Sequence, residues 1–429
     1  MKRKLISGCL MLALAVAILT PVQKVEAANV LKISTTRELD EFAKRVSSGT
    51  NYKGYTVKLM NDLQYDGTVN NFEPIGSSVF EEFSGIFDGG NHTISGIDCT
   101  GSGLFGRIDA GAVVKNLTLE NCSFTTDSAD DSGSIAARIG DNEQKGTIDN
   151  CHVIGGEVIN TAPKSDAGGL IGEGAGDIRN CSSSASVTAD FYAGGIIGEL
   201  NGKFSTLSNS YNLGTITSKQ KEYSPSAFGA GGLIGNLADV WNNISILNCY
   251  SAGTASAGLI YHSNWGGTVG NCYYMEDSAT ISIQESGSIR EKNNSVYSAS
   301  YMQSDEFLKT LNSNAASKDT WMAWEFADGS DYPVLKQAKS SPNLKASVGT
   351  KTYKASALSK KTASFRISAK AKNSIGYKVT TGKKYISVSS DGKVKIKKKT
   401  PKGTYKIQVF TTENAKYKKA TLNITIKVK

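Results

Sequence analysis

A short motif recurs from residue 103 to residue 272, and it constrains the fold more than any other feature of the chain. Its clearest copy is Gly168-Gly169-Leu170-Ile171-Gly172, followed by Ile178-Arg179-Asn180-Cys181. Further copies of the glycine half lie at 103–106, 194–198, 231–235 and 258–260, and the asparagine half places Asn at 116, 150, 180, 209, 248 and 271. Asparagine spacings of 34, 30, 29, 39 and 23 residues indicate a solenoid of stacked coils with loops of variable length.

One repeat divides into three short strands, at 168–172, 177–181 and about 185–189. Three short strands per coil predict a parallel β-helix, and the crossover rule for parallel strands predicts a right-handed one. We expect the glycines to lie at bends. The asparagines are expected to adopt a left-handed backbone and to form an inward ladder of side-chain amides along the stack, which leaves no room for glycans at their sequons.

Both ends of the solenoid are expected to carry caps. Residues 35–46 predict a helix that begins at Ser34 or Thr35 and buries Leu39, Phe42, Ala43 and Val46. After the last repeat, residues 304–312 predict a short helix, followed by Trp321, Trp324 and Tyr332. Bulky side chains are expected there because an open β-helix end exposes its core and its strand edges.

Charge divides the chain into segments of opposite sign. Residues 1–27 have a basic start, a short apolar run and Val25-Glu26-Ala27, which is typical of a cleaved secretory signal peptide rather than a membrane span. Residues 28–342 carry 21 basic and 36 acidic residues, whereas residues 343–429 carry 23 and 2. We therefore predict three segments: a signal peptide (1–27), an acidic capped β-helix (28–342) and a basic module (343–429).

The basic module shows strand patterns of period two at 364–368, 376–379, 385–388, 393–396, 404–409 and 422–428. Glycine turns separate several of these strands, and lysines alternate with apolar residues. So many short strands in so short a module predict an immunoglobulin-like β-sandwich. The fold class expected for the whole chain is therefore all-β.

Six cysteines remain after the predicted signal peptide: Cys99, Cys122, Cys151, Cys181, Cys249 and Cys272. Four of them share one repeat position and would stack along the solenoid. Stacked strands lie about 4.8 Å apart, close enough for disulfides. A ladder of buried thiols is the preferred interpretation, and the spacing does not fit a zinc site.

The Gly-Gly-(Leu/Ile)-Ile-Gly repeats resemble the GLUG motif of large secreted and surface proteins of Gram-positive bacteria, including stalk regions of some immunoglobulin A peptidases. The segment containing Pro74-Ile75-Gly76 and 87–94 is similar to the segment that usually precedes such repeats, and residues 343–429 resemble bacterial immunoglobulin-like modules. The resemblance implies a cell-surface or adhesive role. The chain contains no Leu-Pro-x-Thr-Gly sorting signal, so the resemblance does not extend to covalent wall anchoring.

No catalytic residue, cofactor or metal site is predicted. The three histidines, His92, His152 and His262, are far apart, and no His-Glu-x-x-His motif occurs. Asp127, Asp130 and Asp131 form an acidic loop that is either solvated or a calcium site. The group of Tyr261, His262 and Trp265 is either a corner loop or an aromatic platform for a sugar.

The lysines of the basic module give the strongest functional prediction. Six of them lie within ten residues of each other: Lys393, Lys395, Lys397, Lys398, Lys399 and Lys402. Such a concentration of charge predicts salt-sensitive binding to a polyanion, and outside a Gram-positive cell the abundant polyanions are teichoic acids. The alternative interpretation is a lysine-rich surface that only keeps the module soluble.

Two functions of different classes follow from these observations. The first is a secreted, non-catalytic binding scaffold: the basic module holds the anionic cell wall, and the β-helix presents its loops to a glycan or protein ligand. The second is an enzyme, a lyase or glycoside hydrolase, that cleaves a polysaccharide in a groove along the β-helix. Converging carboxylates beside a basic residue would favour the enzyme, and scattered acids would favour the scaffold. Neither the ligand nor the oligomeric state follows from the sequence.

Overall fold

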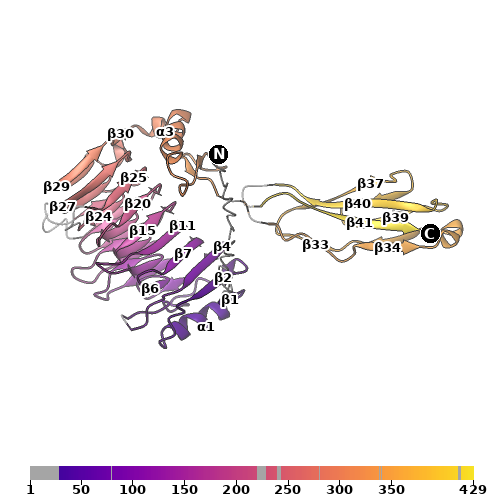
Figure 1. The fold of residues 1–429 in the computed structure, drawn as a ribbon, viewed down its shortest axis with the longest axis horizontal. Helices are drawn as coiled ribbons and strands as arrows, with labels where there is room; N and C mark the ends of the chain where they lie inside the picture. Colours follow the sequence, from indigo (N-terminus) through magenta and orange to yellow (C-terminus); the bar gives the residue numbers. More distant parts are fainter. Residues whose placement is uncertain are drawn as a thin grey trace, which may run out of the picture.

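The computed structural model describes residues 29–78, 80–219, 229–238, 243–279, 281–337, 339, 341–413 and 417–429; of residues 264–265 and 284–288 it describes the backbone only. The predicted signal peptide, residues 1–27, lies outside these ranges. Two bodies follow each other along the chain, a solenoid of stacked coils and a small β-sandwich (Figure 1).

Three parallel sheets run along the solenoid and contain 21, five and four strands. Neighbouring coils pair in register, so that equal motif positions lie side by side; Ile171, for example, pairs with Ala136 and with Ile197. The core is a continuous column of aliphatic side chains that includes Ile148, Ile178 and Leu207. The prediction of a parallel β-helix is confirmed.

The largest sheet consists of three ladders that bend into one another. The first contains β6 (Phe105–Ile108), β10 (Ala136–Ile139), β14 (Ile171–Gly174), β19 (Ile197–Leu200), β24 (Ile234–Leu237) and the start of β27 (Ile260–Gly270). The second contains β1 (Asn29–Ile33), β2 (Tyr55–Leu59), β4 (Ile86–Ser95), β7 (Val113–Glu120), β11 (Gly146–Ile154), β15 (Gly176–Arg179), β20 (Thr206–Ser208), β25 (Ser245–Leu247) and the end of β27. The third continues from β3 (Leu63–Gln64) and the ends of β4, β7 and β11 to β16 (Ser182–Ser183), β21 (Tyr211–Asn212), β26 (Tyr250–Ser251), β28 (Tyr273–Met275) and β30 (Ser295–Tyr297). The last coil adds β29 (Ile283–Lys292), which pairs with β27.

The two smaller sheets form the other sides of the coils. The five-stranded sheet contains β5 (Asp98–Cys99), β8 (Ser123–Thr126), β12 (Glu157–Asn160), β17 (Ser186–Ala189) and β22 (Ile216–Ser218). The four-stranded sheet contains β9 (Ser132–Gly133), β13 (Ala167–Gly168), β18 (Ala193–Gly194) and β23 (Ala230–Gly231).

Two of the three strands expected in one repeat need correction. The segment 168–172 is divided between β13 and β14, which belong to different sheets, because the chain turns at Gly169 and Leu170. A Cβ on Gly169 would lie 2.1 Å from the carbonyl oxygen of Gly195, so this turn requires glycine. The segment 177–181 ends early, as β15, because Asn180 has a φ of 56°. The third strand, 185–189, is confirmed as β17.

The six repeat asparagines all adopt the left-handed backbone, with φ between 48° and 56°. Their amides form a ladder in which Nδ2 of one asparagine donates to Oδ1 of the preceding one: 2.9 Å from Asn150 to Asn116, 2.9 Å from Asn209 to Asn180, and 2.8 Å from Asn248 to Asn209. The ladder is interrupted where Asn180 donates to Asp149 instead. A second gap lies between Asn271 and Asn248, where Asn248 Oδ1 accepts a hydrogen bond from Asn314 Nδ2. The expected bend is confirmed at all six positions, and the ladder is confirmed apart from these two gaps.

The expected inward direction of this ladder is wrong, because the ladder faces a segment that follows the last coil. Trp324 Nε1 donates to Asn209 at 2.8 Å, and the backbone N–H of Met322 donates to Asn180 at 2.9 Å. Both asparagines are almost fully buried by this cover. Their side chains therefore have no open surface for a glycan.

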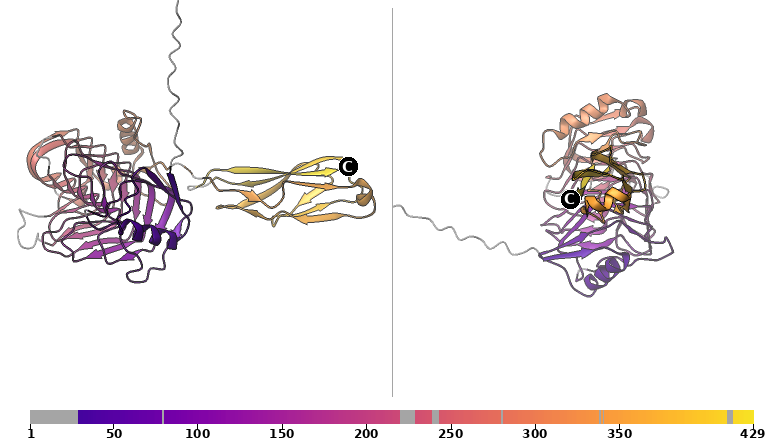
Figure 2. Two further views of the ribbon diagram at one scale, coloured as in Figure 1. Left: turned by 60° about the horizontal axis from the view of Figure 1, so that its bottom comes forward. Right: turned by 90° about the vertical axis from the view of Figure 1, so that its right-hand side faces the viewer.

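Helix α1 (Thr36–Val46) lies at the indigo end of the stack (Figures 1 and 2). Thr35 and Glu38 form a reciprocal capping box at its start, and its buried face consists of the four predicted residues, Leu39, Phe42, Ala43 and Val46. The amphipathic pattern therefore predicted both the helix and its orientation.

The short helix η2 (Glu276–Ser278) precedes β29. After the last coil, the chain forms α2 (Ala299–Met302), α3 (Asp305–Ala315), β31 (Trp324–Glu325) and β32 (Val334–Leu335). Helix α3 has Ser304 as its N-cap. Phe307, Leu311 and Trp324 pack on a stack of tyrosines, Tyr211, Tyr250 and Tyr273, from the third ladder. The expected terminal cap thus also covers the flank of the solenoid, and Gln337 at its end contacts His152.

All six cysteines predicted for the mature chain are buried thiols without a disulfide. Burial raises the pKa of Cys181 to about 12, and it also raises the pKa of Cys151. Thiols that stay protonated and inaccessible act as small apolar residues. The preferred interpretation of the cysteine ladder is therefore confirmed.

The C-terminal module is a β-sandwich with its own apolar core around Ile407, Val409, Ile424 and Ile426. One sheet has the order β34 (Thr350–Tyr353), β41 (Ala420–Val428), β40 (Gly403–Thr411), β37 (Ile375–Thr381); the other has β35 (Ala363–Arg366), β39 (Lys393–Ile396), β38 (Ile386–Val388). The six predicted strands are present. The short β33 (Lys345–Ala346), β34, β36 (Ala369–Lys370) and helix α4 (Ala355–Lys360) were not predicted.

Candidate functional site

The six predicted lysines lie on β39 and in the turn that follows it, and we call this group the lysine edge: Lys393, Lys395, Lys397, Lys398, Lys399 and Lys402. Lys393 and Lys395 alternate with buried Val394 and Ile396 on β39, so their side chains lie on the outer face of the sheet. The other four follow in the turn before β40, and all six are exposed. The period-two pattern therefore places these charges in solvent.

Hydrogen bonds within the turn fix the backbone of the lysine edge. Thr400 Oγ1 donates to the carbonyl of Lys397 at 2.7 Å, and Tyr405 Oη donates to the carbonyl of Pro401 at 2.7 Å. The Lys399 backbone is left-handed, and its N–H donates to Leu358 of α4. These bonds hold the backbone through hydroxyl and amide groups, and none of them uses a lysine ammonium group.

The acidic residues of the module do not neutralise this edge. Asp391 pairs with Arg366 at 2.8 Å, and Glu413 pairs with Lys339 at 2.8 Å. Hydrogen bonds to Ser389 and Lys339, respectively, lower the pKa of the two carboxyls. Among the described residues, no ion pair joins an acid to any lysine of the edge, so its positive charge remains available to a ligand.

A second group of charged and polar residues runs along the first ladder of the solenoid, and we call it the charged row: Arg107, Arg138, Glu173, Glu199, Asn236 and His262. Each member occupies the same position in its coil, and the strand register places them side by side. Adjacent positions in such a ladder are ~4.8 Å apart. The repeat therefore brings residues from six coils into one line.

Arg138 lies at the centre of a network in this row. Its Nη2 is 2.7 Å from Asp131 Oδ2 and 2.6 Å from Glu173 Oε2. Asp131 also accepts the backbone N–H of Asp166, and Asn201 Nδ2 donates to Glu173 Oε1 at 2.9 Å. On the next coils, Asn236 Nδ2 donates to Glu199 Oε2 at 2.6 Å. Acids and a basic residue thus converge on this face.

The crowding of carboxylates changes their protonation. Burial raises the pKa of Glu173 to about 8, and the hydrogen bond to Asp131 and its charge act in the same direction. Burial and the charge of Asp131 also raise the pKa of Asp166. Two carboxyl groups in contact share a proton rather than both ionising. At neutral pH, Glu173 therefore acts as a hydrogen-bond donor as well as an acceptor.

Replacement of Glu173 by Gln is expected to remove part of the pH dependence of stability. The native state holds a proton on Glu173 that the unfolded state releases above a pKa of 4.5, so wild-type stability falls as the pH rises from that value through about 8. Gln cannot ionise, and E173Q should exceed the wild type by about 1–3 kcal/mol at pH 9. Urea unfolding from pH 5 to 9 measures this difference.

The matched control for this comparison is Glu41→Gln on α1, whose side chain is 53% exposed. E41Q should follow the wild-type pH profile. If the curves of E173Q and the wild type run parallel between pH 5 and 9, the shared proton is not present.

The acidic loop does not form the calcium site that we considered. Asp131 is buried and engaged by Arg138, Asp130 lies 3.6 Å from Arg107, and Asp127 is exposed. Arginines, rather than a cation, therefore neutralise two of the three carboxylates. In the described part of the chain, no group of three or more His, Cys, Asp or Glu side chains is close enough to hold a metal ion.

Both interpretations of Tyr261, His262 and Trp265, the corner loop and the aromatic platform, need correction, because Tyr261 and His262 lie on strand β27. Tyr261 is 1% exposed and occupies the space beside Gly229, so it cannot stack on a ligand. The side chain of Trp265 lies outside the described residues. His262 instead stacks on Tyr192, with ring centroids 5.4 Å apart at 25°. The other histidines are separate: burial lowers the pKa of His152 to about 4, and His92 lies 3.0 Å from Asp62.

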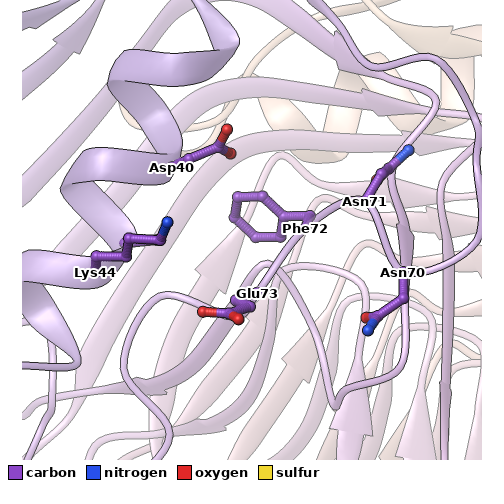
Figure 3. Close-up of a pocket in the computed structure, with 7 residues that line it drawn as sticks. Asp40, Lys44, Asn70, Asn71, Phe72 and Glu73 are labelled. Atoms are coloured by element: carbon purple, nitrogen blue, oxygen red, sulfur yellow. The ribbon is translucent and has the colours of Figure 1, made fainter.

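A polar cleft of about 200 Å³ lies between α1 and the loop at 70–73. Figure 3 shows Asp40 and Lys44 of α1 on one side and the loop residues on the other. Its amide groups are already used, since Asn71 donates to the carbonyl of Gly96 and accepts the N–H of Asp98. This cleft lies between the N-terminal helix and the first coils, and it offers few free polar groups to a ligand.

Comparisons with known proteins assign this chain to no family. No protein-family model matches it. It is 30% identical over 182 residues to halomucin of Haloquadratum walsbyi, a match that covers 38% of this chain and 2% of halomucin. The solved structure of an IgA1 protease is 18% identical, with a TM-score of 0.44, over 62% of this chain and 21% of that one. Among the described residues, no helix is long and apolar enough to cross a membrane.

The sequence analysis missed the charged row, although a signal for it was present. Glu173 and Glu199 follow Gly172 and Gly198 at the same motif position, and Arg107 follows Gly106. In-register stacking turns a repeated motif position into a row of neighbours. Asp131 and Asp166 share a second position, four residues before Ile135 and Leu170, respectively. The contact between Asp131 and the charged row depends on the turn between β9 and β10.

Proposed function

We propose that this protein is secreted and acts as a cell-surface binding scaffold, and that its lysine edge holds the chain on an anionic polymer of the cell wall. The observation that carries the proposal is the lysine edge itself: six exposed cations on β39 and the turn that follows it, none paired with an acid among the described residues. A chain of phosphate groups, as in a teichoic acid, is opposite in charge to such an array.

The rest of the molecule is consistent with separate roles for the solenoid and the module. The solenoid is a rigid, acidic body, and its own core is separate from that of the module. The glycine–asparagine repeats and the basic start of the chain favour a GLUG-type surface protein of a Gram-positive bacterium. In this proposal, the solenoid presents its loops to a glycan or protein while the module retains the molecule on the wall.

Binding to chemically defined cell walls tests the proposal. Mature protein, residues 28–429, should sediment with native Gram-positive walls. It should remain in solution with walls from which the phosphate-rich polymer has been extracted. Equal sedimentation with both preparations would show that another component is the ligand and would contradict the proposal.

A second candidate, cleavage of a polysaccharide, is favoured by one observation in the charged row. Glu173 and Glu199 are in register on adjacent coils, and Asn201 Nδ2 lies 2.9 Å from an oxygen of Glu173 and 3.5 Å from one of Glu199. Strand spacing of ~4.8 Å is close to the ~5–5.5 Å between the two carboxyls of retaining glycosidases. Glu173, with its raised pKa, would serve as the acid and Glu199 as the nucleophile.

The release of reducing ends from wall polysaccharides decides between the two candidates. The enzyme hypothesis requires release by the wild type that Glu199→Gln abolishes. Wild-type protein that binds walls and releases none supports the scaffold alone.

A further inference from the structure

We infer that a cavity at the N-terminal end of the charged row binds the carboxylate of an acidic sugar through Arg107 and Arg138. The cavity measures about 240 Å³ and lies where the turns before β6 and β9 meet the first ladder. It is lined by Arg107, Arg138 and Asp130, and by the hydroxyl-bearing residues Ser77, Thr100, Ser102, Thr126 and Ser128. This site belongs to the solenoid and is separate from the lysine edge.

The two arginines have donor groups that the fold does not use. The contact from Arg107 to Asp130 is 3.6 Å, which is longer than a hydrogen bond. Arg138 contacts Asp131 and Glu173 through Nη2 alone, and its Nε has no hydrogen-bond partner. Because Arg107 and Arg138 are in register on adjacent strands, their guanidinium groups can approach one ligand together.

The charges around the cavity favour a singly charged ligand over a dianion. Two guanidinium groups provide the attraction, while Asp130 lines the same cavity and Asp131 lies beside Arg138. Asp130 and Asp131 would repel a phosphate dianion more strongly than a carboxylate ligand, because the dianion carries twice the negative charge. Glu173, which keeps its proton at neutral pH, adds no second full negative charge to the network.

The lining hydroxyl groups define the rest of the ligand. Ser102, Thr126 and Ser128 can both donate and accept hydrogen bonds, which suits the hydroxyls of a sugar ring. A fork of guanidinium donors beside such groups matches a uronic acid: a planar carboxylate attached to a polyol. We assign the cavity to a uronate residue, either at the end of a glycan or within it.

Titration calorimetry with sodium glucuronate tests this assignment on the full mature chain. Wild-type protein should bind glucuronate, and Arg107→Met should weaken binding about tenfold or more because the guanidinium–carboxylate contact is lost. Arg107→Lys keeps the charge but not the planar guanidinium group. Its affinity for glucuronate should lie between that of the wild type and that of Arg107→Met. Urea unfolding of each variant confirms that the solenoid remains folded.

Three controls separate this site from other cationic surfaces. Arg290→Met, on the last coil, should bind glucuronate like the wild type, and so should a variant with the six lysines of the lysine edge replaced by Gln. Glucose should bind at least tenfold more weakly than glucuronate. Equal affinity for R107M and the wild type, or for inorganic phosphate and glucuronate, would overturn the assignment, whatever the result of the wall-binding experiment.

Discussion

A single methyl group at Gly194, introduced as Gly194→Ala, is expected to destabilise the solenoid by about 3 kcal/mol or more. A Cβ at this position would lie 1.8 Å from the carbonyl oxygen of Ile197 and 2.8 Å from the backbone nitrogen of Gly235 in the next coil. Both atoms belong to the paired backbone, so no side-chain rotation relieves the clash. Because each coil is stabilised by its neighbours, displacement of one coil also weakens the next.

Urea unfolding measured by circular dichroism gives the size of this effect. Gly349→Ala in the module is the matched control, since a Cβ there has no neighbour within 4 Å and its backbone needs no positive φ. G349A should leave the solenoid transition unchanged. A G194A protein with the wild-type unfolding midpoint would contradict the close stacking of the glycine motif.

The second large effect is expected at the lysine edge. Replacement of Lys393, Lys395, Lys397, Lys398, Lys399 and Lys402 by Gln should reduce binding to wall polyanions about a hundredfold or more near 50 mM salt. Six charges that each release a counterion account for an effect of this size. All six side chains are exposed and the turn is held by Thr400 and Tyr405, so the module should remain folded.

A control variant that loses the same number of positive charges shows whether the position of the lysines matters. Gln at Lys345, Lys370, Lys378, Lys406, Lys418 and Lys427 removes six exposed lysines from other parts of the module. This variant should lose much less affinity in surface plasmon resonance on immobilised teichoic acid. If both sextuple variants lose the same affinity, the module binds through its total charge and the lysine edge is not a distinct site.

The most reliable predictions of structure came from periodic patterns in the sequence. Glycine and asparagine at fixed motif positions predicted the coils, and period two predicted the alternation of Lys393 and Lys395 with Val394 and Ile396. The buried face of α1 followed from its amphipathic spacing. These features depend on local geometry, which is why one sequence was enough.

Contacts between distant segments were not predictable in the same way. The amide of Asn209 meets Trp324, 115 residues later, so the outward direction of the asparagine ladder depends on where the final segment packs. The contact of Asp131 with Glu173 through Arg138 likewise requires the turn that divides β9 from β10. A motif gives the position of a residue within its coil but not the side chain that will face it.

The central claim, retention on a polyanion through the module, is tested most directly by the salt dependence of wall binding. Residues 28–429 and 28–342 are measured on the same purified teichoic acid from 50 to 500 mM sodium chloride. For the longer chain, the logarithm of the association constant should fall linearly with the logarithm of salt concentration, with a slope of about −4 if six lysines bind phosphates. The shorter chain should not bind. A slope near zero, or equal binding by both chains, would contradict the account.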